Sequence, residues 1–100
     1  MNIKFKYNED EILDDFKKYV ENTYSQHYIG DNNIQSLDLI FAIGRGEGFC
    51  IGNIIKYAAR YKKKKGQEYN DVMKILHYAL LLKYIYDLDV KNKVIETTKS

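Results

Sequence analysis

The chain has 100 residues, of which 45% are hydrophobic and 30% are charged, and its formal net charge is +2. This length predicts one domain, residues 1–100, and so small a net charge excludes an argument for nucleic-acid binding from overall charge alone. The longest apolar run, "YALLL", is too short to cross a membrane, so we expect no membrane partner. The single Cys50 excludes an internal disulfide and fits a cytoplasmic location.

The first elements follow from residue spacing. Residues 3–7 alternate lysine with apolar side chains, which predicts a short strand. Asn8 and Glu11 then form a capping-box pattern. Apolar side chains at helical spacing follow them and predict a helix over residues 9–24.

Glycines mark the next part of the chain. The polar segment "SQHYIGDNN" predicts a loop, and "SLDLIFAI" predicts a short helix that begins at Ser36. In "GRGEG", glycines at 44, 46 and 48 can turn backbone N–H groups toward a ligand, or they can simply connect two helices. The segment lacks the ending of a Walker phosphate loop.

The stretch "GNIIKYAARYKKKKG" predicts an amphipathic helix over residues 49–64. At 100° per residue, one side is apolar, and we expect it to face the core: Ile51, Ile54, Ile55 and Ala58. The opposite side is polar and forms a cationic stripe: Asn53, Lys56, Arg60 and Lys64. Lysines 62–65 also suit the end of a helix dipole, so a structural explanation stays open for them.

A fourth helix is expected from residue 70 or 71 to about residue 87. It is apolar nearly all round, which predicts burial on more than one side and therefore a homo-oligomer with this helix as the seam. The tail, residues 91–100, contains strand formers that could pair with the N-terminal strand or with a neighbouring subunit. The sequence therefore predicts a mainly α fold of about four helices, with a small two-stranded sheet from the termini.

The search for catalytic patterns assigns no catalytic residue. His27 and His77 have no metal-site spacing, so no metal is predicted. The six acids within residues 8–21 read equally well as the solvated face of a helix and as a patch that pairs with the bases of another subunit. The pairs Glu11-x-x-Asp14 and Glu68-x-x-Asp71 only weakly echo the all-helical nucleoside-triphosphate pyrophosphatases.

The string "GFCIGNIIKYAARYKKKKG", followed by "DVMKILHYALLL", resembles a small bacteriophage domain family of unknown function, some members of which are described as nucleotide kinase-like. The resemblance covers about residues 27–85. Family members carry a Gly-Asn-x-x-Lys-Tyr-x-x-Arg-Tyr helix, a Lys-Gly turn, and a second helix with an acid and a lysine near its start. The resemblance implies a phage protein in the cytoplasm of an infected bacterium, a nucleotide ligand and an oligomer.

The resemblance also implies phosphate contacts by Asn53, Lys56 and Arg60, with His27 and Tyr28 nearby. We therefore expect a protein that holds a nucleotide on its cationic helix face, for instance as an anti-defence sponge for a cyclic nucleotide immune signal. Tyr57 could stack on the base or simply pack. The expected ligand-binding residues are Asn53, Lys56, Tyr57, Arg60, Lys64, Arg45, His27 and Tyr28.

Two other functions stay open at this point. One is a deoxynucleoside monophosphate kinase or other phosphotransferase, which would use Mg²⁺; otherwise no cofactor is expected. The other is an inhibitor of a host system that binds nucleic acid or protein through the lysine run.

Overall fold

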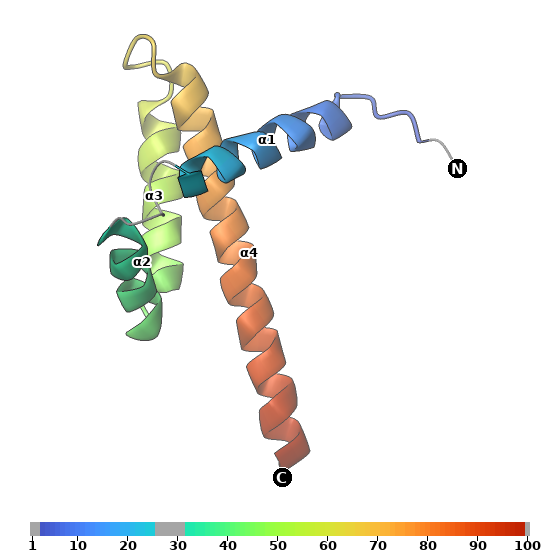
Figure 1. The fold of residues 1–100 in the computed structure, drawn as a ribbon, viewed down its shortest axis with the longest axis vertical. Helices are drawn as coiled ribbons and strands as arrows, with labels where there is room; N and C mark the ends of the chain where they lie inside the picture. Colours follow the sequence, from blue (N-terminus) through green and yellow to red (C-terminus); the bar gives the residue numbers. More distant parts are fainter. Residues whose placement is uncertain (1–2, 26–31, 100) are drawn as a thin grey trace. The chain divides into compact units, whose positions relative to one another are not determined.

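The structure, a computed structural model, describes residues 3–25 and 32–99, with side chains described for residues 3–25 and 36–93. Over these residues it is mainly helical, as predicted (Figure 1). The helices are α1 (Glu9–Thr23), α2 (Asn32–Ala42), α3 (Gly46–Arg60) and α4 (Glu68–Lys99). The chain divides into two compact units, residues 1–35 and 36–100.

The first unit contains α1, whose bounds confirm the predicted helix. Phe16 and Thr23 are its buried residues. The predicted capping box is wrong, because Asn8 has a left-handed backbone with φ 58° and its side chain makes no cap hydrogen bond. The Glu9 carboxylate instead accepts a hydrogen bond of 2.7 Å from the Tyr7 N–H, which closes the turn before the helix.

The predicted sheet from the termini is also wrong. Within the described residues there is no strand: the segment before α1 is irregular, and residues 91–99 continue α4. A helix satisfies its own backbone hydrogen bonds, whereas an isolated terminal strand needs a partner for every N–H and C=O group. The tail therefore gains more from extending a helix already nucleated than from forming a two-stranded sheet.

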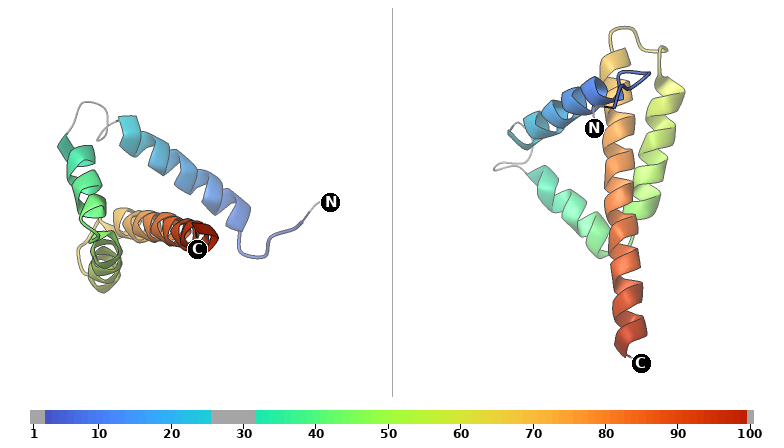
Figure 2. Two further views of the ribbon diagram at one scale, coloured as in Figure 1. Left: turned by 90° about the horizontal axis from the view of Figure 1, so that it is seen from below. Right: turned by 90° about the vertical axis from the view of Figure 1, so that its right-hand side faces the viewer.

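The second unit is built on an antiparallel pair, α3 and α4, which lie side by side (Figure 2). Residues 61–67 join them, with left-handed backbones at Lys62 (φ 66°) and Gly66 (φ 84°). The helix expected to run to residue 64 therefore ends at Arg60, because Tyr61 has an extended backbone (ψ 127°) and Lys62 a left-handed one. Lysines 62–65 lie in this turn and not on a helix end.

The face of α3 that packs on α4 differs from the expected one. Gly46 and Cys50 are buried and Asn53 and Tyr57 are half-buried. Two apolar residues expected in the core are exposed: Ile51 at 40% and Ile55 at 64%. Ala58 is exposed as well, and Ile54 is half-buried. The reason lies in α4, which offers aromatic and charged partners to the polar side of α3.

The "GRGEG" segment is only partly a loop. Gly44, with φ 76°, makes the turn after α2, whereas Gly46 and Gly48 belong to the first turn of α3. A Cβ atom on Gly46 would lie 2.6 Å from Phe41 Cδ1 and 2.9 Å from Ile85 Cδ1. Glycine therefore lets α2, α3 and α4 approach closely at this end of the hairpin, which fixes the position of α3 on α4.

Candidate ligand-binding site

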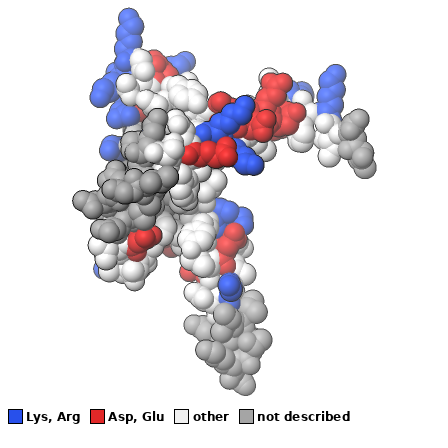
Figure 3. All heavy atoms as spheres, viewed as in Figure 1, with Lys and Arg blue, Asp and Glu red and all other residues white. Residues whose placement is uncertain are grey.

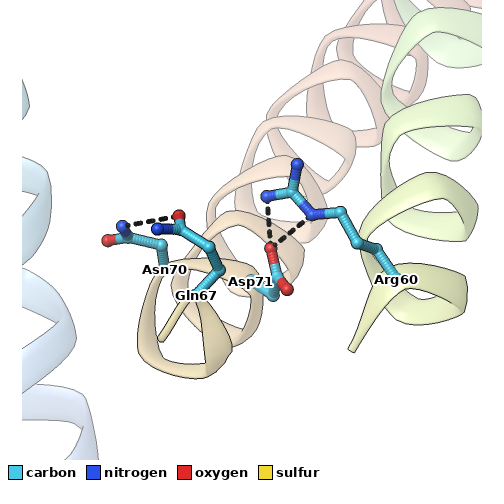
Figure 4. A network of polar contacts seen from close by, with 4 residues as sticks. All are labelled: Arg60, Gln67, Asn70 and Asp71. Carbon is cyan, nitrogen blue, oxygen red and sulfur yellow. Dashed lines mark hydrogen bonds and ion pairs between the residues drawn. The ribbon is translucent and has the colours of Figure 1, made fainter. Parts of the chain in front are cut away.

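An ion pair between Arg60 and Asp71 joins the last turn of α3 to the first turn of α4 (Figure 4). Arg60 Nε donates to Asp71 Oδ1 at 2.9 Å, and Arg60 Nη2 donates to the same oxygen. The Asp71 side chain is 0% exposed, whereas that of Arg60 is 31% exposed. This hydrogen bond raises the pKa of Arg60 further above its ordinary value, so the guanidinium stays charged.

Asp71 is anchored through one oxygen only. Its other oxygen, Oδ2, is buried and has no hydrogen-bond partner among the described residues. A buried ion pair with such incomplete hydrogen bonding contributes little net stability, because desolvation of the charges offsets their attraction. The pair is therefore better understood as a device that fixes the Arg60 side chain in place.

An aromatic cluster lies beside this ion pair. The Tyr57 and Tyr78 rings stack with centroids 6.1 Å apart, and Phe49 meets Tyr78 edge-on at 5.7 Å. Two cations lie near the Tyr57 ring: Arg60 Cζ is 4.8 Å and Lys56 Nζ is 5.1 Å from its centroid. Cation–π attraction at such distances brings the exposed Lys56 and the half-exposed Arg60 together.

Asn53 lies on the same side of α3, one turn before Lys56. It is half-buried, and its Nδ2 donates a 2.9 Å hydrogen bond to the Phe49 carbonyl. One of its amide N–H groups is thus engaged within the helix. The structure therefore gathers Asn53, Lys56, Tyr57 and Arg60, all four expected from the sequence, on one stretch of α3.

The other expected residues are distributed differently. Lys64 lies in the turn directly after Arg60. Arg45 is exposed and precedes α3, whose length of about 21 Å separates its first residue from Arg60. Arg45 and the "GRGEG" segment therefore do not join Lys56 and Arg60 within one chain. The predictions for His27 and Tyr28 fall outside the described residues.

The opposite end of the hairpin has a pocket of about 260 Å³. Its two charged residues are acidic, Glu47 and Asp89, which disfavours a phosphate. Its walls are otherwise apolar or uncharged and come from the α2–α3 corner and the second half of α4: Phe41, Gly44, Gly46, Ile85, Leu88 and Asn92.

Sequence reasoning does not place Asp71, Tyr78 or Phe49 in the site. It assigns Asp71 only to the start of a helix and to a motif that weakly resembles those of the pyrophosphatases. A signal was present, because an arginine on a helix face that packs against another helix needs a counter-charge. The aspartate eleven residues after Arg60 is the acid that the hairpin brings back to it.

Within the part of the chain that the structure describes, no group of three or more His, Cys, Asp or Glu residues could hold a metal ion. Over the same residues, no helix combines the length and the apolar character that a bilayer crossing needs.

His77 is 8% exposed, and burial, followed by the positive charge of Lys74, lowers its pKa.

Comparison with known proteins identifies a family. Residues 22–80 match DUF3310, a family described as proteins of unknown function. No match was found among curated proteins or among solved structures. The matched region contains α3, the lysine turn and α4 as far as Leu80, and hence every residue of the ion pair and aromatic cluster. The α4 wall of the acidic pocket lies beyond it. Because the match covers more than half of the chain, the protein belongs to the DUF3310 family.

Proposed function

We propose that this protein binds a phosphate-bearing nucleotide at Lys56 and Arg60 and holds it without chemical change. One observation carries the proposal: two cations lie near one tyrosine ring, and one of them is fastened to a fully buried carboxylate. Side chains ordered in advance lose less conformational entropy on binding, which favours affinity. Lysine and arginine are the side chains that form the strongest hydrogen bonds to phosphate oxygens.

The arrangement supports holding more than phosphoryl transfer. A phosphotransferase needs an acceptor positioned in line with the transferred group, commonly beside a carboxylate that takes the proton. The carboxylate of this cluster, Asp71, is 0% exposed and engaged by Arg60. It therefore acts on Arg60 and is not presented to a ligand.

The biological setting belongs to the same proposal and rests on the sequence resemblance. We place the protein in a bacteriophage, acting in the cytoplasm of its host as a sponge for a nucleotide signal such as a cyclic nucleotide. The cationic face supports phosphate as the recognised group, and the base is to be identified by experiment.

Self-association is also part of the proposal. On α3, Ile51 and Ile55 are exposed on the face turned away from α4. On α4, a ridge at i, i+4 and i+8 is exposed as well: Leu80 at 43%, Tyr84 at 50% and Leu88 at 39%. Apolar faces of this kind mark association surfaces. Sedimentation velocity should show an oligomer that Tyr84→Glu dissociates, and a wild-type monomer at all concentrations would contradict it.

The direct test is to identify what the purified protein carries. Native mass spectrometry should detect a bound species at fixed stoichiometry, and denaturation followed by chromatography should release an intact nucleotide. The Lys56→Gln variant should retain less ligand, whereas Lys91→Gln, an equal loss of charge on the far part of α4, should retain it fully. Release of a chemically altered nucleotide would contradict holding, and equal retention in both variants would contradict this site.

A further inference from the structure

The cationic surface does not stop at Lys56 and Arg60. It continues into the turn, where all four lysines, residues 62–65, are exposed. In Figure 3 blue side chains gather at the end of the hairpin where α3 and α4 are joined. Residues 52–66 contain six basic residues and no acidic one. Of the nearby acids in α4, Asp71 is fully buried and Glu68 is half-buried.

This surface carries more charge than one phosphate group can use. Lys56 and Arg60 are separated by about 6 Å along the axis of α3, which is close enough for both cations to contact a single phosphate. The four turn lysines lie beyond Arg60, past the end of the helix. A ligand with phosphates distributed along a backbone can engage both Lys56 and the turn.

The ring that is available to stack on a base also lies at the turn. Tyr57 is half-buried, stacked on Tyr78 and approached by Lys56 and Arg60, so it does not offer an open face to a base. Tyr61, at the start of the turn, is 39% exposed, and Lys62 Nζ lies 5.6 Å from its ring centroid. An exposed ring with a neighbouring cation is what sequence-tolerant binding of single nucleotide strands uses.

We propose that the ligand is an oligonucleotide with two or more phosphates, which runs from Lys56 to the lysine turn and stacks a base on Tyr61. This inference rests on the proposed function and adds the class of ligand. A short linear strand and a cyclic dinucleotide share the required chemistry, which is phosphodiester-linked nucleotides beside an aromatic platform.

Three probes test this on the full-length protein: thymidine monophosphate, an eight-nucleotide oligothymidylate and cyclic di-AMP. Calorimetric titration at two salt concentrations gives each dissociation constant. We expect the better of the two multi-phosphate probes to bind at least about tenfold more tightly than the mononucleotide, and its affinity to fall more steeply with salt. Whichever of these two binds more tightly identifies the linear or the cyclic source.

Two variants locate the binding. Tyr61→Ala should weaken binding of the preferred multi-phosphate probe about tenfold and leave binding of the mononucleotide nearly unchanged. The double variant Lys63→Gln, Lys65→Gln should weaken binding of the same multi-phosphate probe and make its affinity less dependent on salt. The matched control is Lys17→Gln, Lys18→Gln, which removes the same charge from α1 and should change neither the affinity nor its salt dependence. Circular dichroism confirms that each variant stays folded.

Failure of this inference is distinguishable from failure of the proposed function. If all three probes bind equally, depend on Lys56 and ignore Tyr61 and the turn lysines, the oligonucleotide inference is overturned and the nucleotide site stands. If the multi-phosphate probes bind through the turn but ignore Lys56→Gln, the proposed site at Lys56 and Arg60 is wrong. If no probe binds, both proposals fail.

Discussion

The two ends of the α3–α4 hairpin differ in the residues that hold the helices together. At the turn end, a half-exposed arginine, a buried aspartate and a group of lysines surround stacked tyrosines. At the other end, Gly46 leaves no space between the helix backbone and the side chains of Phe41 and Ile85. The difference indicates two kinds of contact: close apolar packing holds the helices together at one end, and the charged end is where we propose that a ligand binds.

The largest effect on stability should come from breaking the ion pair at the turn end, and it should be asymmetric. Arg60→Ala leaves the Asp71 carboxylate buried without a counter-charge. For a buried charge this costs about 3 kcal/mol or more in the free energy of unfolding. Asp71→Ala should cost clearly less, because Arg60 is already 31% exposed and can turn to water. Urea denaturation of both variants measures the difference.

The double variant Arg60→Met, Asp71→Leu provides the control for this asymmetry. Because it removes both charges, it should recover most of the stability lost in Arg60→Ala. If the double variant is as unstable as Arg60→Ala, the loss arises from packing and the assignment of Asp71 as a costly buried charge is wrong.

The next largest effect should come from the closely packed end of the hairpin. Gly46→Ala places a Cβ atom 2.6 Å from the Phe41 ring, so we expect a loss of about 1–3 kcal/mol in unfolding free energy. Gly52→Ala, in the middle of the same helix, meets nothing within 4 Å and should stabilise by up to about 1 kcal/mol. Thermal denaturation of the two variants should therefore move in opposite directions, and equal shifts would contradict the close approach at Gly46.

A smaller effect should depend on pH. Burial lowers the pKa of His77 below its ordinary value of 6.5, so the unfolded chain takes up this proton before the folded one. The free energy of unfolding should therefore fall as pH decreases below about 6.5, and this contribution should level off once the folded His77 is also protonated. Urea denaturation from pH 7.5 to 5 should show a shallower decline in His77→Gln than in His27→Gln, and identical slopes would exclude His77 as the cause.

The smallest effect concerns Cys50, in the second turn of α3, which is 0% exposed. Burial raises the pKa of its thiol, so little thiolate forms at neutral pH. Because it is the single cysteine of the chain, reaction with Ellman's reagent reports it alone. The reaction should be slow in the folded protein and rapid in urea, whereas rapid reaction without urea would show that the hairpin opens readily.

Much of the fold could be predicted from local signals. The bounds of α1 and the existence of four helices follow from apolar spacing, because such spacing reports helical periodicity directly. The end of α3 and the extension of α4 could not be predicted. The first depends on the extended backbone of Tyr61 and the left-handed backbone of Lys62, which lysine rarely adopts. The second depends on a tail whose strand formers favoured the wrong alternative.

The packing of the candidate site could be predicted only in part, because it depends on tertiary contacts. Spacing placed Asn53, Lys56 and Arg60 on one side of a helix correctly, but it expected the opposite, isoleucine side to face the core. Which side packs depends on the partner helix, and here α4 presents Asp71 and Tyr78, which suit a polar and aromatic face better than an isoleucine face. A pairing between residues eleven apart across a turn is tertiary information that periodicity does not contain.

We propose above all that Lys56 and Arg60 together hold the phosphate of a nucleotide. Calorimetric titration of wild type, Lys56→Gln and Lys91→Gln with the ligand released from the purified protein, or with the tightest of the three probes if none is released, tests it most directly. We expect one site per chain, an affinity reduced about tenfold by Lys56→Gln, and no change in Lys91→Gln. Equal affinity in all three proteins, or no binding at all, would contradict it.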